Sequence, residues 1–124
     1  MKLISQDQKI VVFGSNGMVG SAIIRKLKEN EYLNILAPKR GDLNLLESNA
    51  VENWFNQNKP EVVVIAAAKV GGIFANNKYP ADFILENLKI QINIIETAWK
   101  KNIKKLLFLG SSCIYPKYSS QPIK

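Results

Sequence analysis

The chain has 124 residues, about the size of one folded domain, and carries a formal net charge of +7 at pH 7. Its hydrophobic fraction of 47% and charged fraction of 22% are ordinary for a globular protein. No segment approaches the roughly 20 apolar residues of a membrane helix, and the first residues lack the continuous apolar core of a signal peptide. We therefore expect a cytoplasmic protein that does not bind membranes.

The cysteine, histidine and lysine content narrows the partners further. One cysteine, Cys113, cannot form an internal disulfide, and without any histidine no metal-ligand spacing is present, so we expect no metal site. The basic residues are scattered over expected helix ends and loops and form no stripe interleaved with aromatic residues. This distribution argues against nucleic acid and favours an anionic small molecule, although most of the lysines are expected to be solvated surface.

Apolar periodicity predicts alternating strands and helices along the chain. We expect strands at 9–14, 32–37, 61–66 and 105–109, and helices at 18–30, about 47–58 and about 80–101. Continuously apolar strands are typical of a parallel sheet that is covered on both faces. With right-handed crossovers, the alternation predicts an α/β partial Rossmann fold, a parallel sheet of about four strands in the order 3-2-1-4 with helices on both faces. Asn44 and Ser48 are candidates for capping the second helix.

The long helix expected at 80–101 carries two apolar stripes, which is more than a sheet-facing side needs. One stripe contains Leu85, Leu88, Ile92, Ile95 and Trp99, and the other contains Phe83, Ile90, Ile94 and Ala98. One of them must cover the sheet. The other is open to a second copy of the chain in a homodimer, to a separately encoded C-terminal part, or to other segments of the same fold.

A glycine-rich run follows the first strand and opens the next helix; it consists of Gly14, Ser15, Asn16, Gly17, Met18, Val19 and Gly20. Glycines let the backbone approach a pyrophosphate, and the N-terminus of the following helix directs its N–H groups at that anion. The spacing G-x-x-G-x-x-G differs from the dinucleotide fingerprint G-x-G-x-x-G, and a turn that needs glycine only for positive φ and close helix packing is the alternative. The flanking strand and helix favour phosphate binding, so we predict that this run binds a dinucleotide cofactor.

The end of the second expected strand bears on the choice between NAD and NADP. NAD-binding units place an acidic residue there, about 20 positions beyond the glycines, but this chain has Lys39 and Arg40. An arginine pairs with a 2′-phosphate through charge-assisted, bidentate hydrogen bonds, so these residues favour NADP(H) over a merely solvated turn. Asp42 has two interpretations, a cap of the local turn or a contact with the adenine amino group.

Small residues follow the third and fourth expected strands, on the side of the sheet where α/β proteins bind ligands. Ala67 follows the third strand, and Gly110, Ser111, Ser112 and Cys113 follow Leu109. A serine hydroxyl there can donate to a carbonyl that becomes an alkoxide, and a thiol can move a proton. Taken alone, Ser111 and Cys113 are better explained as a turn residue and a small buried hydrophobe.

Segments spread over most of the chain match one enzyme family. The matching segments are 14–22, 42–46, 66–73, 75–77, 79–84 and 106–117. They closely resemble the GDP-L-fucose synthases, which are extended short-chain dehydrogenases/reductases, and 66–73 and 110–117 distinguish these enzymes from other sugar-nucleotide epimerases. The resemblance implies NADPH-dependent epimerisation of GDP-4-keto-6-deoxy-D-mannose at two carbons beside the ketone, followed by hydride reduction to GDP-L-fucose.

The resemblance also implies residue roles. Ser111 would hydrogen-bond the 4-keto oxygen, and Cys113 would act as an acid or base in epimerisation. The run from Gly14 to Gly20 would bind the pyrophosphate and Arg40 the 2′-phosphate. The remaining residues that we assign to cofactor binding are Asp42, Leu43, Ala67, Leu109, Gly110, Ser111 and Ser112, the last four along the nicotinamide.

This chain departs from the family pattern at two places. Asn16 stands where the family often has an arginine, which removes one cation from the phosphate end. The family's Tyr-x-x-x-Lys pair, its histidine and its substrate domain would lie beyond Lys124. We therefore expect residues 1–124 to be the NADP-binding Rossmann domain, the N-terminal part of such an enzyme, and to be inactive alone. The alternatives are a non-catalytic nucleotide-binding or subunit-interaction module and a truncated relic.

Overall fold

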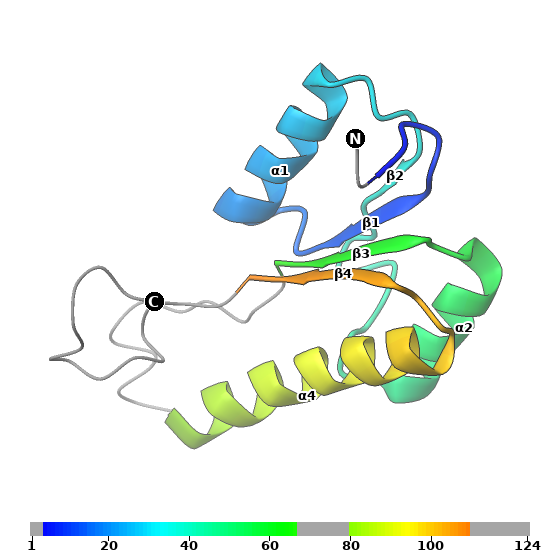
Figure 1. The fold of residues 1–124 in the computed structure, drawn as a ribbon. Helices are drawn as coiled ribbons and strands as arrows, with labels where there is room; N and C mark the ends of the chain where they lie inside the picture. The colour runs from blue at the N-terminus through cyan, green and yellow to red at the C-terminus, as the bar shows by residue number, and fades with distance from the viewer. Residues whose placement is uncertain (1–3, 67–79, 110–124) are drawn as a thin grey trace, which may run out of the picture.

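The computed structural model describes residues 4–66 and 80–109 (Figure 1). Its elements in chain order are β1 (Ile10–Phe13), α1 (Met18–Glu29), β2 (Ile35–Leu36), α2 (Ser48–Asn58), β3 (Val62–Ile65), α4 (Pro80–Lys100) and β4 (Lys105–Phe108). The expected strands and helices are all present, but the second strand is much shorter than predicted. Within the two described ranges, no helix has the length and apolar character needed to cross a membrane.

The strands form one parallel, four-stranded sheet in the order β2-β1-β3-β4. The α/β class and the parallel sheet are confirmed, but the expected order 3-2-1-4 is wrong, because the third strand lies beside the first and not beyond the second. All four side chains of β3 are buried, whereas the two of β2 are only half-buried. A continuously apolar strand such as β3 needs neighbours on both edges, and the place between β1 and β4 supplies them.

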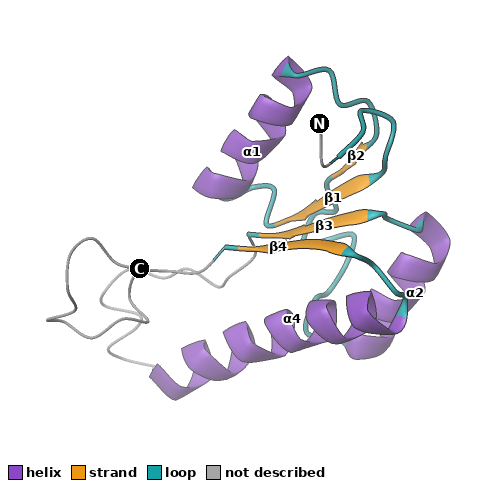
Figure 2. Ribbon diagram, in the orientation of Figure 1, coloured by secondary structure: helices purple, strands orange, loops and turns teal. Residues whose placement is uncertain are grey.

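Helices cover both faces of this sheet (Figure 2). Successive side chains of a strand point to opposite faces, so β1 and β3 each contribute to two layers. On one face, Ile10, Val12, Val62 and Val64 pack against Ile23, Ile24 and Leu27 of α1. On the other face, Val11, Phe13, Val63 and Ile65 pack against Val51 and Phe55 of α2 and Ile90, Ile94 and Ala98 of α4. The predicted two-sided cover is therefore confirmed.

The two apolar stripes of α4 have different surroundings. Ile90, Ile94 and Ala98 are at most 8% exposed and cover the sheet, and Phe83, the other member of that stripe, has a side chain outside the description. The residues from Leu85 to Trp99 in the second stripe are between 41% and 75% exposed. The structure thus identifies which stripe serves the core.

The start of α2 differs from the prediction. Its N-cap is Glu47, and no side chain caps it. Asn44 instead accepts a hydrogen bond from the Leu46 N–H at 3.1 Å, so it closes the turn before the helix. The Asn93 side chain of α4 donates to the Leu45 carbonyl at 2.8 Å and ties this turn to the long helix.

Candidate nucleotide-binding site

The carboxyl ends of β1, β3 and β4 advance together along one edge of the sheet. The Ala66 N–H donates to the Phe13 carbonyl at 2.9 Å, and the Leu109 N–H donates to the Ile65 carbonyl at 3.2 Å. The glycine run leaves β1 at this edge, and Leu109 follows β4 at the same edge. Ligands of parallel α/β sheets bind outside the carboxyl ends of the strands, so the fold brings these predicted site residues to the appropriate edge.

The glycine run forms a tight turn whose backbone contacts the helix after it. Gly14 has a φ of 90°, a conformation that favours glycine. The Gly17 N–H donates to the Gly14 carbonyl at 3.1 Å and closes the turn. A Cβ atom on Gly20 would overlap the Gly14 carbonyl oxygen and lie 2.7 Å from the carbonyl carbon. The third glycine is thus required because the first turn of α1 packs directly on the backbone of Gly14.

The N-terminus of α1 is suited to an anion. Its N-cap, Gly17, makes no side-chain cap hydrogen bond, and the first turn contains no acidic residue. The N–H groups of a first helical turn have no acceptor within the helix, and the helix dipole adds partial positive charge at this end. Met18 is 88% exposed and Val19 54% exposed, so this end of the helix is accessible. These features fit a pyrophosphate at the turn.

The second predicted contact region is the turn after β2. Asp42 accepts a hydrogen bond from the Lys39 N–H through Oδ2 at 3.3 Å, and its own N–H donates to the Lys39 carbonyl at 2.9 Å. Asp42 therefore caps the local turn, which was one of its two interpretations, whereas a contact with adenine stays a prediction. The side chains of Lys39 and Arg40 are exposed. Because β2 runs parallel to β1, this turn belongs to the same edge as the glycine run.

Leu43 has a different environment from the other predicted site residues. Its side chain is 6% exposed and belongs to the core cluster that contains Phe13 and Phe55. The side chain is thus committed to packing, and only the backbone of Leu43 is left to contact a cofactor. The sequence analysis placed this residue at the site without predicting its burial.

An aromatic cluster that sequence reasoning missed supports the glycine turn. The Phe13 ring lies edge-on to Trp54 with centroids 5.6 Å apart, and it stacks on Phe55 at 5.9 Å. Phe13 is the last residue of β1 and directly precedes Gly14, so these rings fix the direction in which the chain enters the turn. The available signal was an aromatic residue at the strand end together with an adjacent aromatic pair in a predicted helix.

Five predicted site residues lie outside the described part of the chain, namely Ala67, Gly110, Ser111, Ser112 and Cys113. The structure therefore brings together the predicted residues of the phosphate end. The assignments on the nicotinamide and substrate side stay predictions.

Comparisons with known proteins point to one family. Residues 10–124 match the model of the NAD dependent epimerase/dehydratase family. GDP-L-fucose synthase 1 of Arabidopsis thaliana is 56% identical over 118 residues, an alignment that covers 95% of this chain and 36% of that protein. GDP-L-fucose synthase of Escherichia coli K12 is 51% identical over 116 residues, covering 94% of this chain and 36% of the relative. The chain thus spans about a third of the length of these curated relatives.

A solved structure shows the same likeness in three dimensions. The GDP-D-glycero-L-gluco-heptose synthase from Campylobacter jejuni, determined in the presence of NADPH, superposes with a TM-score of 0.90 at 36% sequence identity. The match covers 98% of this chain and 35% of that one. The chain is therefore a homologue of the N-terminal part of GDP-L-fucose synthases, and it belongs to the NAD dependent epimerase/dehydratase family.

Proposed function

We propose that residues 1–124 form the NADP(H)-binding domain of an enzyme that epimerises and reduces a GDP-linked keto sugar. The observation that carries the proposal is the close packing of Gly20 on the Gly14 carbonyl, next to an uncapped helix N-terminus. A turn that needed glycine only for its φ angle would not require a glycine at both positions. The relation to nucleotide-sugar enzymes supports a dinucleotide as the ligand.

In this proposal the turn holds the pyrophosphate through backbone groups. The first N–H groups of α1 donate to the phosphate oxygens, and the helix dipole stabilises their negative charge. Ser15 and Asn16 lie within the turn and contribute uncharged side chains. Because no cation stands in the turn itself, the charge that selects between cofactors must come from elsewhere on the edge.

That charge comes from the turn after β2. Arg40, with Lys39 beside it, binds the 2′-phosphate that distinguishes NADPH from NADH. Asp42 supports this role by holding the turn through the Lys39 N–H. A carboxylate hydrogen-bonded in its own turn competes less for the arginine, so the cationic side chain remains available to the phosphate.

The chemistry of the proposed reaction comes from the cofactor and from two side chains after β4. NADPH supplies the hydride that reduces the keto group. We assign Ser111 to a hydrogen bond with the 4-keto oxygen, which stabilises the negative charge that develops there. Cys113 is assigned to proton transfer at the carbons beside the ketone. The substrate class, a GDP-4-keto-6-deoxy-D-mannose converted to GDP-L-fucose, follows the names of the relatives.

Calorimetric titration of the chain with NADPH and, separately, with NADH tests the proposal. We expect NADPH to bind with a dissociation constant at least about tenfold lower than that of NADH, because only NADPH carries the phosphate that Arg40 pairs with. Equal affinities would remove the 2′-phosphate assignment. Binding of neither cofactor would overturn the proposed function.

A further inference from the structure

The exposed stripe of α4 has the spacing of a helix-packing seam. Leu85, Leu88, Ile92, Ile95 and Trp99 follow one another at intervals of three, four, three and four residues. Their side chains are 52%, 48%, 54%, 41% and 75% exposed. Apolar residues at this alternation occupy the a and d positions of a heptad, which pack against a second helix. We refer to these five residues as the α4 seam.

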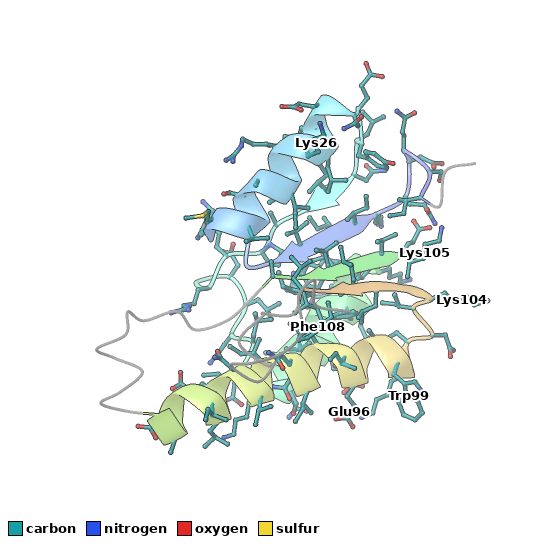
Figure 3. The ribbon with its side chains drawn as sticks, turned by 60° about the vertical axis from the view of Figure 1, so that its left-hand side comes forward. Lys26, Glu96, Trp99, Lys104, Lys105 and Phe108 are labelled. Atoms are coloured by element: carbon teal, nitrogen blue, oxygen red, sulfur yellow. The ribbon has the colours of Figure 1, made fainter. Side chains whose placement is uncertain are left out.

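The seam lies apart from the core contacts of α4. The helix already covers the sheet with Ile90, Ile94 and Ala98, so the seam is not needed for that packing. Figure 3 shows Glu96 and Trp99 projecting from α4 on the side away from β4 and the sheet. An exposed apolar surface of this regularity is typical of an interaction site.

We propose that the α4 seam binds the α4 seam of a second copy of this chain, with the two helices antiparallel. In an antiparallel pair, each a residue faces a d residue of the other helix, and e positions face e positions. One register stacks Ile92 on Ile95 of the second copy and Leu88 on Trp99 of the second copy. Two-fold symmetry repeats both layers, so the apolar contact is self-complementary.

Charges at the rim of the seam select this register. Lys89 and Glu96 both occupy e positions, directly after Leu88 and Ile95, and both side chains are exposed. The proposed register sets Lys89 of each copy opposite Glu96 of the other and so forms two ion pairs. A shift of one heptad in either direction sets Lys89 against Lys89 or Glu96 against Glu96, which is repulsive.

The parallel arrangement lacks this complementarity. In parallel pairs, g positions face e positions of the next heptad, which would set Ile84 beside Lys89 and Gln91 beside Glu96. Neither combination joins opposite charges. Lys100, at 3.5 Å from Glu96 on the same helix, leaves the interhelical pair intact because a carboxylate accepts several hydrogen bonds. The charge pattern thus favours a second copy in the antiparallel register, independently of any cofactor.

Sedimentation equilibrium of the full chain tests this inference through charge reversal. We expect the wild-type chain to dimerise reversibly, and Lys89→Glu or Glu96→Lys alone to raise the dimer dissociation constant by about tenfold, because each makes two attractive pairs repulsive. The double variant Lys89→Glu/Glu96→Lys should restore most of the affinity. Lys26→Glu, an exposed reversal on α1, is the matched control and should leave dimerisation unchanged.

A second variant covers the apolar layers. Ile92→Glu places a charge in the middle of the seam at an exposed position, so we expect a monomer with the far-ultraviolet circular dichroism of the wild type. A monomeric wild-type chain would overturn the proposal. It would also be overturned by single reversals that dimerise as the wild type does, or by a double variant no better than the singles, since either result leaves the charges without a role.

Discussion

The two turns at the carboxyl edge of the sheet are built in different ways. The turn from Gly14 to Gly20 depends on backbone contacts that exclude side chains. The turn from Lys39 to Leu43 is held by hydrogen bonds of Asp42 and presents exposed basic side chains. The difference indicates that sterics fix the grip on the pyrophosphate, whereas exposed charges choose the cofactor. Substitutions in the first turn should change stability and binding together, and those in the second should change selectivity alone.

The largest effect is expected for Gly20→Ala. The new Cβ overlaps the Gly14 carbonyl, so the turn must move away from α1, and we expect the free energy of unfolding to fall by about 3 kcal/mol despite a gain in helix propensity of about 1 kcal/mol. NADPH binding should be lost with it. Urea unfolding and NADPH titration measure the two effects.

The control for this variant is Gly41→Ala. A Cβ at Gly41 meets no atom within 4 Å, so the free energy of unfolding should stay within about 0.5 kcal/mol of the wild type. A Gly20→Ala protein as stable as the Gly41→Ala protein would show that the backbone contact has no energetic role.

A smaller loss is expected for Gly14→Ala. The φ of 90° is unfavourable for any residue with a Cβ, and such strain costs about 1–2 kcal/mol. NADPH should still bind, but more weakly, because the strained turn shifts the N–H groups of α1. Thermal unfolding with and without NADPH measures both quantities. An unchanged melting temperature would mean that the turn adopts another conformation without cost.

Arg40→Ser should affect the cofactor alone. The lost pairing with the 2′-phosphate should raise the dissociation constant of NADPH by about tenfold and leave that of NADH unchanged. Since the side chain is exposed, the free energy of unfolding should change by less than about 0.5 kcal/mol. Arg25→Ser, an exposed arginine on α1, is the matched control for a general loss of charge. Equal losses for both cofactors would refute the division between the two turns.

The smallest effect is expected for Asp42→Ala. The Lys39 N–H loses its acceptor at an exposed site, which should lower the free energy of unfolding by about 0.5 kcal/mol and weaken NADPH binding only slightly. Asp42→Asn keeps a side-chain oxygen and should resemble the wild type in chemical denaturation. If the asparagine variant instead binds NADPH as poorly as Arg40→Ser, the carboxylate has a direct role at the cofactor.

The sequence predicted the elements well because apolar runs and helical spacing are local features. The order of the strands was not predicted, since the position of β3 between β1 and β4 depends on burial along both of its edges. The glycine turn was found from its motif. The contact between Gly20 and Gly14 and the burial of Leu43 were not, because each depends on packing between segments that the sequence separates.

The most direct test of the central claim is to locate the cofactor on the chain by amide NMR. We predict that adding NADPH shifts the N–H resonances of Gly14 to Gly20 most strongly and those of Lys39 to Asp42 next, while NADH shifts only the first group. Largest shifts at the opposite edge of the sheet, around Lys9 and Glu61, would contradict the assignment of the glycine turn as the nucleotide-binding site.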